Sequence, residues 1–523
     1  MESVIQSGEE LLNRLIKLKE DDDLSRIGKL FRTNSNCYFY DTGTGKVVQM
    51  EQIVYELLEK FFAGKNETLI RSEELAEFLE VSAKEHLFQA PKITQLYDRG
   101  FYEKLPYQVN QNVQQVILEV TGNCNLRCEY CIYNEGYEEN RNFNSENMSK
   151  ETAFVAIDYL AEHGSEEVAL AFYGGEPLLR FSLIKECIEY AQKVLSEKKV
   201  TYSFTTNCTL MSKEMAEYFS GIKGISILCS IDGPKYIHDE HRKDVNGKGT
   251  FDRAIKGLKN LVIAFQNNKD NVEKQLAING VFCPPYTEEK VEEIYNFFKN
   301  LGWLPENVGI QFEPVRFGSL PVKNKQEKNK VENEFLENPM WSWGKKQYEE
   351  KALPEEEDKK SWLFLSEIEN ALTTIQKRYI YDIPLANYPF NACCIPGARR
   401  IYVNTKGEFL LCERIENSPN IGSIKDGINI EAIKKFYVKE YSDKSIDECK
   451  KCWAIRLCRV CYAECYNKNG IDVEEKCKVC KMIRKSVEEN LKLYHSALEG
   501  LTVWGQYYFP VEITGDICFH TQN

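Results

Sequence analysis

Residues 124–131 read Cys124-Asn-Leu-Arg-Cys128-Glu-Tyr130-Cys131, three cysteines in a C-x3-C-x2-C order with an aromatic residue before the last. Three thiolates on one short loop can bind only three irons of a cubane [4Fe–4S] cluster, so the fourth iron is left open for a substrate or cofactor. A zinc knuckle is the alternative, but zinc sites usually pair two C-x2-C units and close all four positions. The loop therefore favours an iron–sulfur cluster with one open iron.

Strand and turn signals surround this loop. Ile117-Leu-Glu-Val-Thr121 is a short apolar strand pattern, and Gly122-Asn123 turns the chain into the cysteines. Phe172-Tyr-Gly174-Gly175-Glu176-Pro177 follows the next predicted strand. Its glycines let backbone groups approach a ligand closely, and the carboxylate beside them can pair with an ammonium group.

Together the two motifs resemble those of the radical S-adenosylmethionine (SAM) superfamily. The resemblance implies that Cys124, Cys128 and Cys131 bind a [4Fe–4S] cluster whose open iron chelates the amino-acid end of SAM. Reduction of this cluster then cleaves SAM to methionine and a 5′-deoxyadenosyl radical, which abstracts hydrogen from an unactivated carbon. The residues that the resemblance assigns to SAM are Tyr130, Gly174, Gly175, Glu176, Pro177, Ser203, Asn207, Ser230 and Arg242.

The roles of two residues, Asn207 and Asp232, leave alternatives open. The family often has Thr-Asn-Gly where this chain has Thr206-Asn207-Cys208, which leaves the role of Asn207 undecided. Ser230 and Arg242 are candidates for the SAM carboxylate, because a guanidinium group suits bidentate carboxylate binding. Asp232 is a candidate general base, yet a strand-end aspartate that caps the next turn explains it equally well.

The barrel that this family builds agrees with the pattern of residues 110–318. Strand-like and helix-like segments alternate there, with helices expected at 150–162 and 251–265, which predicts a parallel sheet with ligands at the carboxyl ends of its strands. We expect an α/β fold, a partial (β/α)6 barrel. The predicted strands are 116–120, 168–172, 202–206, 225–231, 275–282 and 308–314.

The N-terminal residues 1–105 predict a small hairpin-plus-helices unit. Strand signals at 37–40 and 46–50 flank the turn-rich run 41–45, and helical patterns cover 9–19, 51–62 and 72–87. The pattern resembles the winged-helix-like RiPP recognition element, which binds the leader of a precursor peptide at a strand edge. A cap that merely covers the barrel is the alternative.

Ten cysteines lie between Cys393 and Cys480. Cys394 and Cys412 flank a predicted hairpin of 400–403 and 408–411, and the following Cys-x2-Cys run resembles a SPASM domain with two auxiliary [4Fe–4S] clusters. Two spacings depart from that family: Cys458 to Cys461 is one residue short, and Cys465 is additional. Structural zinc is the alternative. The resemblance assigns Cys449, Cys452, Cys458 and Cys480 to an outer cluster. It assigns Cys394, Cys412 and Cys461 to an inner one, with Cys465 as the candidate fourth ligand; Cys393 and Cys477 stay open as replacements.

Composition limits the remaining choices. The chain has 523 residues and 19 cysteines, which in a cytoplasmic protein favour metal binding over disulfides. A net charge of −13 gives no reason to expect nucleic acid, and no run approaches the roughly 20 apolar residues of a membrane helix. The expected units are 1–105, the leader-binding unit; 110–318, the barrel; 319–388, a helical bridge; 389–485, the SPASM domain; and 486–523, a C-terminal helix and tail.

The leading functional hypothesis is a cytoplasmic maturase that installs sulfur-to-α-carbon thioether (sactionine) crosslinks in a ribosomally synthesised precursor peptide. A flavodoxin or ferredoxin is the expected electron donor. The alternatives are a β- or γ-carbon thioether, a carbon–carbon crosslink, conversion of a sulfatase cysteine to formylglycine, and a zinc-binding peptide scaffold without catalysis.

Overall fold

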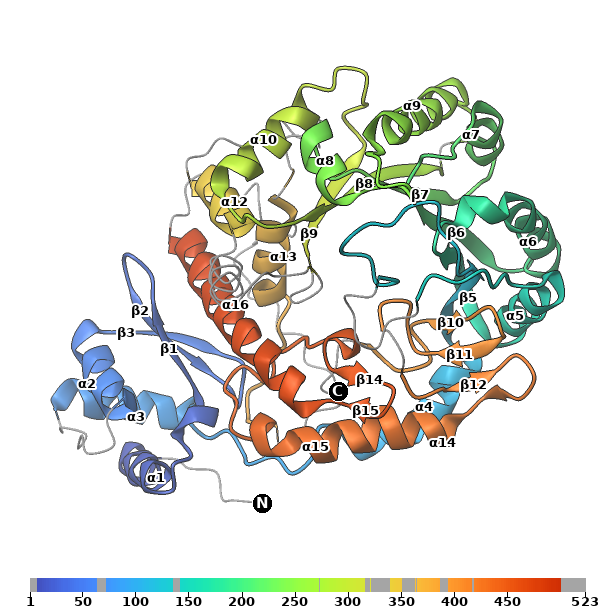
Figure 1. Ribbon diagram of the computed structural model, residues 1–523. Helices are drawn as coiled ribbons and strands as arrows, with labels where there is room; N and C mark the ends of the chain where they lie inside the picture. Colours follow the sequence, from blue (N-terminus) through green and yellow to red (C-terminus); the bar gives the residue numbers. More distant parts are fainter. Residues whose placement is uncertain are drawn as a thin grey trace.

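The computed structural model describes residues 7–63, 72–134, 142–271, 273–315, 320, 339–349, 363, 365–385, 394–415 and 418–499. Figure 1 shows a curved sheet flanked by helices, with a smaller N-terminal unit set against the long helix α16 (Val473–Glu499). Cys393, the alternative to Cys394, lies outside the described residues.

A ten-stranded sheet has the order β13-β12-β11-β10-β4-β5-β6-β7-β8-β9. Strands β4 to β9 are parallel and adjacent in chain order, which confirms the six predicted strands of the barrel. Parallel strands end at a common edge, so the loops that follow them converge there. The six strands are β4 (Val113–Thr121), β5 (Gly164–Gly174), β6 (Lys199–Thr206), β7 (Ile225–Ser230), β8 (Gln275–Phe282) and β9 (Gly309–Pro314).

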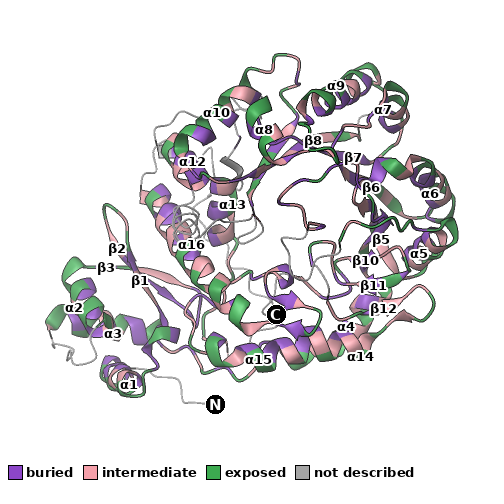
Figure 2. Ribbon diagram, viewed as in Figure 1, coloured by how far each residue is buried: buried purple, intermediate pink, exposed green. Residues whose placement is uncertain are grey.

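Helices between these strands cover the outer face of the sheet, with their buried sides toward the strands (Figure 2). Ser149, Ser212 and Thr287 begin three of them as N-caps, since each side chain accepts a hydrogen bond from a backbone N–H three residues on. Both predicted barrel helices are confirmed. The helices are α5 (Lys150–His163), α6 (Phe181–Val194), α7 (Lys213–Ser220), α8 (Lys235–His241), α9 (Phe251–Asn267) and α10 (Glu288–Lys299).

The predicted cysteine-flanked hairpin extends the barrel sheet. β10 (Ile401–Val403) pairs antiparallel with β11 (Glu408–Leu410), as expected, and also pairs in parallel with β4. Gly407 has φ +81°, a left-handed turn position that favours glycine. β12 (Gly422–Ser423) and β13 (Gly427–Ile428) complete this side of the sheet. The cysteine-rich region is therefore joined to the barrel through backbone hydrogen bonds.

The N-terminal unit contains α1 (Gly8–Glu20), α2 (Gln52–Ala63), α3 (Glu73–Lys84) and a three-stranded antiparallel sheet in the order β1-β2-β3. β2 (Cys37–Asp41) and β3 (Val47–Met50) confirm the predicted hairpin. β1 (Gly28–Arg32) was not predicted, because its five residues show no clean apolar alternation. Phe39 faces α1–α3, whereas Phe31, Tyr38 and Tyr40 belong to a second core on the other side of the sheet.

Helix α16 supplies much of that second core. Leu491 and Tyr494 pack with the aromatic residues of β1 and β2, and Tyr38 donates a 2.7 Å hydrogen bond to Glu499. Lys29 adds a 2.8 Å ion pair with Glu488. The helix begins before the expected C-terminal unit 486–523 and runs through residue 485, where a domain division was expected.

Other helices complete the walls around the sheet edge. α12 (Pro339–Glu349) and α13 (Leu365–Gln376) form the described part of the predicted helical bridge, and α13 packs on α16. The remaining elements are α4 (Arg99–Gln111), α14 (Ile430–Ala432), a π-helical stretch (Ile433–Lys439), α15 (Glu440–Cys449), the hairpin of β14 (Tyr466–Asn467) and β15 (Gly470–Ile471), and the short 3-10 helices Leu24–Arg26, Pro177–Arg180 and Tyr462–Glu464.

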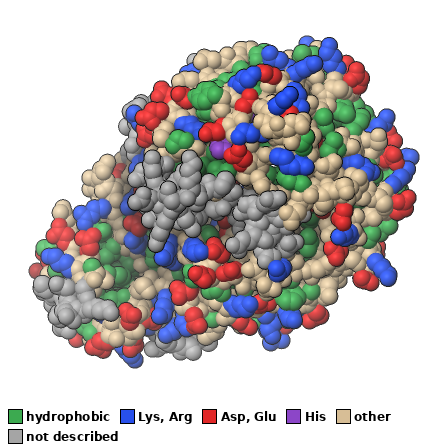
Figure 3. All heavy atoms as spheres, viewed as in Figure 1, with side chains coloured by type: hydrophobic (Ala, Val, Ile, Leu, Met, Phe, Trp, Pro, Cys, Tyr) green, Lys and Arg blue, Asp and Glu red, His purple; other side chains and the backbone are tan. Residues whose placement is uncertain are grey.

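The surface carries both charges. Lys and Arg side chains are interspersed with Asp and Glu over the face shown in Figure 3. Among the described residues, none of the helices has the length and apolar character needed to cross a membrane.

Candidate functional site

The cysteine loop follows the carboxyl end of β4. Cys124 and Cys128 are buried and Cys131 is half-buried, and the three thiols are electrostatic neighbours of one another. Burial raises the pKa of Cys128 to about 12, and burial followed by the nearby Glu176 also raises the pKa of Cys124. Ionising these thiols in place thus requires a compensating positive charge, which a bound metal supplies.

The two glycines of the next motif pack directly against this loop. Gly174 has φ +134°, and a Cβ atom there would lie 2.1 Å from the Thr121 carbonyl oxygen. A Cβ atom on Gly175 would lie 2.2 Å from the Asn123 carbonyl oxygen. The Gly175 N–H donates to Thr121 O at 3.0 Å, and the Glu176 N–H donates to Asn123 O at 3.0 Å. Only glycine fits this contact between two loops.

Glu176 is a buried carboxylate whose hydrogen-bond donors are all neutral. It accepts from Thr206 Oγ1 at 2.9 Å, from the Asn207 N–H at 2.9 Å and from the Leu178 N–H at 3.0 Å. Burial raises its pKa to about 6, against the effect of these donors. An ammonium group bound beside it would restore the charged form, and the assignment of Glu176 to the SAM ammonium stays a prediction. Thr206 was not singled out from the sequence.

Arg242 and Asp232 form a buried ion pair behind Tyr130. Arg242 Nε donates to Asp232 Oδ2 at 2.9 Å, and its Nη1 lies 4.0 Å from Cys128 Sγ. Asp232 also accepts from Tyr130 Oη and from the Val281 N–H. These bonds orient Arg242 and Tyr130, which both line the cavity described below, whereas Asp232 does not line it. The predicted base therefore has the contacts of a positioning residue.

Some of the other predicted residues line the cavity, and the others lie outside its lining. Ser230 and Asn207 line the cavity, and Asn207 Nδ2 donates to Asn125 Oδ1 at 3.0 Å and lies 4.0 Å from Cys124 Sγ. Pro177 is buried at the start of the turn after Glu176, and Ser203 lies within β6; neither lines the cavity.

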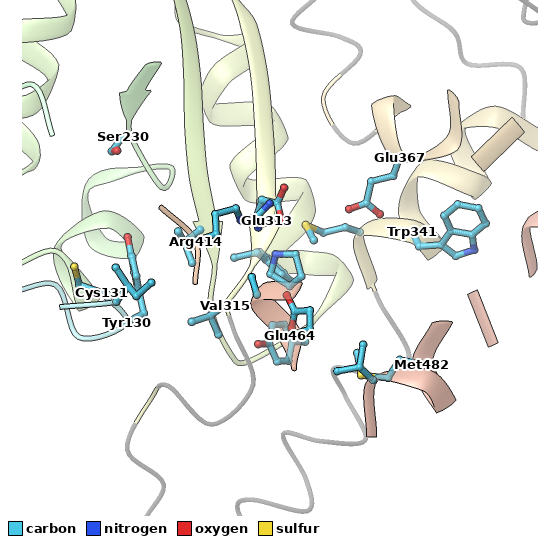
Figure 4. A pocket seen from close by; sticks show the side chains of 18 of the residues that line it. Tyr130, Cys131, Ser230, Glu313, Val315, Trp341, Glu367, Arg414, Glu464 and Met482 are labelled. Carbon is cyan, nitrogen blue, oxygen red and sulfur yellow. Dashed lines mark ion pairs between the residues drawn. The ribbon is translucent and has the colours of Figure 1, made fainter. Parts of the chain in front are cut away.

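A cavity of 1270 Å³ opens above the cysteine loop. Figure 4 shows Tyr130 and Cys131 at one side, Glu313, Arg414 and Glu464 in the middle, and side chains of α12, α13 and α16 opposite. Arg414 forms a 3.6 Å ion pair with Glu313. The face of α16 in this far wall carried no sequence signal, because α16 reaches the site only through tertiary packing. Its residues from these helices include Trp341, Lys345, Glu367, Asn370, Glu475, Lys478, Met482, Ser486 and Asn490.

The four thiols assigned to the outer cluster line one small pocket of 80 Å³, together with Cys477 and Lys476. Burial raises the pKa of Cys458 to about 12, and the nearby thiols Cys480 and Cys449 add to this effect. The donor set suits an iron–sulfur cluster or zinc equally. Within the part of the chain that the structure describes, no three His, Cys, Asp or Glu side chains stand close enough together to hold a single metal ion.

The thiols assigned to the inner cluster are less closely gathered. Cys412 and Cys461 share Arg414 as an electrostatic neighbour, and Arg400 Nη1 lies 3.9 Å from Cys412 Sγ. The thiol of Cys465 has both Cys461 and Cys480 as neighbours, so the additional cysteine adjoins both sets. Cys394 is half-buried before β10. Membership of Cys465 in the inner set stays a prediction.

Comparison with known proteins decides the identity of the barrel. Residues 118–298 match the family model described as the radical SAM superfamily. This segment is a radical SAM domain. A radical SAM domain implies a [4Fe–4S] cluster and SAM, and the buried thiols, the glycine contact and Glu176 fit both groups.

Relatives extend the similarity beyond that domain. The chain is 28% identical over 363 residues to a cysteine-type anaerobic sulfatase-maturating enzyme of Clostridium novyi, covering 67% of this chain and 87% of that protein. An uncharacterized protein of Methanocaldococcus jannaschii, MJ0907, is 28% identical over 62% of this chain and 92% of its own length. A solved structure described as anSMEcpe with bound AdoMet shares the fold, with a TM-score of 0.52 at 21% identity, over 76% of this chain and 99% of that one.

Proposed function

We propose that this chain is a radical SAM maturase that installs sulfur-to-α-carbon thioether crosslinks in a cysteine-containing precursor peptide. The observation that carries the proposal is the continuous cavity. It joins the Cys124–Cys131 loop to Arg414, Ala463 and Glu464, which adjoin the inner cysteines, and then to α16. A volume of 1270 Å³ exceeds the about 300–1,000 Å³ of ordinary small-molecule pockets, which leaves room for a peptide segment beside SAM.

The residues at the strand ends would hold the cofactor. Cys124, Cys128 and Cys131 would bind the cluster, Glu176 would pair with the SAM ammonium, and Arg242 would bind its carboxylate. When bound, cluster and SAM together supply an oxidising equivalent strong enough to remove hydrogen from an unactivated carbon. The protein's part is to position the peptide and to exclude water: Asp232 fixes Arg242, and the buried loop shields the reacting atoms.

A thiol must reach the α-carbon for this crosslink to form. The inner cysteines Cys394, Cys412 and Cys461, if they bind a cluster with one iron open, would offer that iron to the substrate thiolate next to Arg414. Formation of one S–Cα bond removes a hydrogen from sulfur and another from carbon. One hydrogen would leave as an atom in the SAM-dependent step, and an auxiliary cluster held by these cysteines would supply the acceptor for the second electron, while the second proton goes to solvent.

The N-terminal unit is proposed to bind the peptide leader at β3. Both faces of its sheet are covered, one by α1–α3 and the other by α16, and β3 is an edge strand. The Asp41 N–H donates a hydrogen bond to the Lys46 carbonyl oxygen. Since hydrogen-bonded and non-hydrogen-bonded pairs alternate along an antiparallel ladder, the N–H and C=O groups of Val47 and Gln49 point away from β2. These outward groups are free to accept an added peptide strand.

Formylglycine formation is the second candidate, favoured by the similarity to the Clostridium novyi sulfatase-maturating enzyme. Both reactions start at a cysteine-containing substrate, and they differ in the fate of sulfur. A thioether crosslink keeps the sulfur and loses two hydrogens, whereas conversion of cysteine to formylglycine exchanges the sulfur for oxygen.

The test is to incubate the anaerobically reconstituted enzyme with SAM, reductant and peptide, and to measure the product mass. The probes are a cysteine-containing peptide encoded by a short reading frame beside the gene and a sulfatase-derived cysteine peptide. The proposal expects loss of two hydrogens per crosslink in the first peptide, with thiols no longer alkylatable. Sulfur loss from the second peptide alone would replace it with formylglycine formation. Protein that binds zinc but no iron would return the chain to the scaffold alternative.

A further inference from the structure

Lys476 is a buried lysine in the outer cysteine pocket. It lies in the first turn of α16 and is 2% exposed. Its Nζ donates to Cys449 Sγ at 3.3 Å and lies 4.0 Å from Cys480 Sγ. Lys476 and Cys480 are four residues apart on the helix, so their side chains share one face. The ammonium group is thereby fixed between two of the four predicted ligands.

The polar partner of this ammonium is cysteine sulfur rather than a carboxylate. Among the described residues, Lys476 forms no ion pair with an Asp or Glu side chain, whereas the buried Arg242 beside the Cys124–Cys131 loop pairs with Asp232. The ring of Tyr441 also lies close, with its centroid 5.5 Å from Nζ, and the thiols of Cys458 and Cys465 are further electrostatic neighbours. A buried cation is stabilised by a nearby anion, and when a cluster is bound here the ligating Cys449 and Cys480 sulfurs would supply that negative charge.

An exposed lysine offers a natural comparison. Lys481 lies on the same helix and lines the same pocket, but it is exposed to solvent. Water screens an exposed charge far more than a buried one, so Lys481 contributes little to the field inside the pocket.

We propose that Lys476 is a positioning residue for the outer auxiliary cluster. Its ammonium group holds the Cys449 and Cys480 sulfurs in place and raises the reduction potential of the cluster that they bind. This inference rests on the proposed function only in that the outer thiols bind a [4Fe–4S] cluster. One-electron reduction adds a negative charge to such a cluster. A buried ammonium hydrogen-bonded to the ligand sulfurs stabilises the reduced form over the oxidised one, which makes the outer cluster a better electron acceptor.

The experiment is a dithionite titration followed by EPR on full-length protein in which Cys124, Cys128 and Cys131 are replaced by Ala, so that only auxiliary clusters give signals. The signal that Cys480→Ala removes identifies the outer cluster. On this background, Lys476→Met is expected to lower the midpoint potential of that signal, and Lys476→Arg to keep it near the parent value. Lys481→Met is the matched control and is expected to leave it unchanged.

Two results would overturn the inference. One is an unchanged midpoint potential in Lys476→Met at full iron content; the other is an equal shift in Lys481→Met, which would make the effect one of overall charge. If Lys476→Met does not retain iron, Lys476→Gln is measured instead. A midpoint potential of Lys476→Gln equal to that of Lys476→Arg would count against the proposal. Zinc in the outer site would also refute it. The titration contains no peptide, so failure of the proposed crosslinking leaves its result intact.

Discussion

Replacing Asp232 by Asn tests whether this residue positions Arg242 or acts as a base. The Arg242–Asp232 ion pair is 2.9 Å long, and the two side chains are 8% and 3% exposed. Both carboxylate oxygens accept hydrogen bonds, so an Asn amide in either orientation would point its NH2 at another donor. Breaking a buried pair in this way costs about 3–5 kcal/mol of unfolding free energy, because Arg242 keeps an uncompensated charge.

The matched control is Asp252→Asn, which breaks an ion pair with Lys235 whose side chains are 74% and 58% exposed. That variant is expected to lose no more than about 1 kcal/mol. The assay is urea unfolding of the full chain before cluster reconstitution, followed by circular dichroism, together with SAM binding to the reconstituted enzyme. Asp232→Asn should unfold at lower urea and bind SAM more weakly. Because removing both charges leaves neither uncompensated, Asp232→Asn/Arg242→Met should lose less stability than the two single variants added together.

A different outcome would refute the positioning role. If Asp232→Asn unfolds at the wild-type urea concentration and binds SAM with wild-type affinity, yet loses peptide modification, then Asp232 acts on the substrate itself.

Three further predictions concern the cofactor and the leader. Burial raises the pKa of Glu176 to about 6, so its carboxylate protonates as the pH falls through 6. SAM affinity, measured by equilibrium dialysis, should weaken by up to about tenfold for each pH unit below that point. Glu176→Gln should bind SAM weakly at every pH. Gly175→Ala places a Cβ atom 2.2 Å from the Asn123 carbonyl oxygen and should lose SAM binding. The control Gly302→Ala, where a Cβ atom meets nothing within 4 Å, should bind SAM normally. Normal SAM binding by Gly175→Ala would show that the two loops do not need this contact. Gln49→Pro removes an outward N–H from the exposed edge of β3 and should weaken binding of a fluorescent leader peptide without changing SAM cleavage in its absence; unchanged leader affinity would place the leader elsewhere.

The barrel was largely predictable because its signals are local. Each of the six strands is an apolar run followed by a turn, and the residues of the cysteine loop and of Gly174–Glu176 have to stand at strand ends to function. β1 was missed because a short edge strand in an antiparallel sheet needs no strong pattern of its own. The hairpin at 401–410 was predicted, but its parallel pairing with β4 was not, since a long-range pairing leaves no mark on sequence spacing.

Residues of the site that belong to short sequence motifs could be predicted, whereas residues brought there only by tertiary packing could not. Glu176 and Arg242 were found from short motifs, whereas Thr206, Arg414 and the face of α16 that lines the cavity depend on which elements meet in three dimensions. The interpretation of Asp232 shows the same limit. Sequence places it at a strand end, and only the structure shows three hydrogen-bond donors around its carboxylate.

The most direct test of the central claim is mass spectrometry of a precursor peptide that carries deuterium at the α-carbon of each candidate acceptor residue. The enzyme is incubated anaerobically with this peptide, SAM and reductant, and the fragments are sequenced. The account predicts that each crosslink removes one α-deuterium, transfers it to the deoxyadenosine product and leaves the cysteine sulfur in the peptide. Retention of every α-deuterium in a modified peptide, or loss of sulfur from the cysteine, would contradict it.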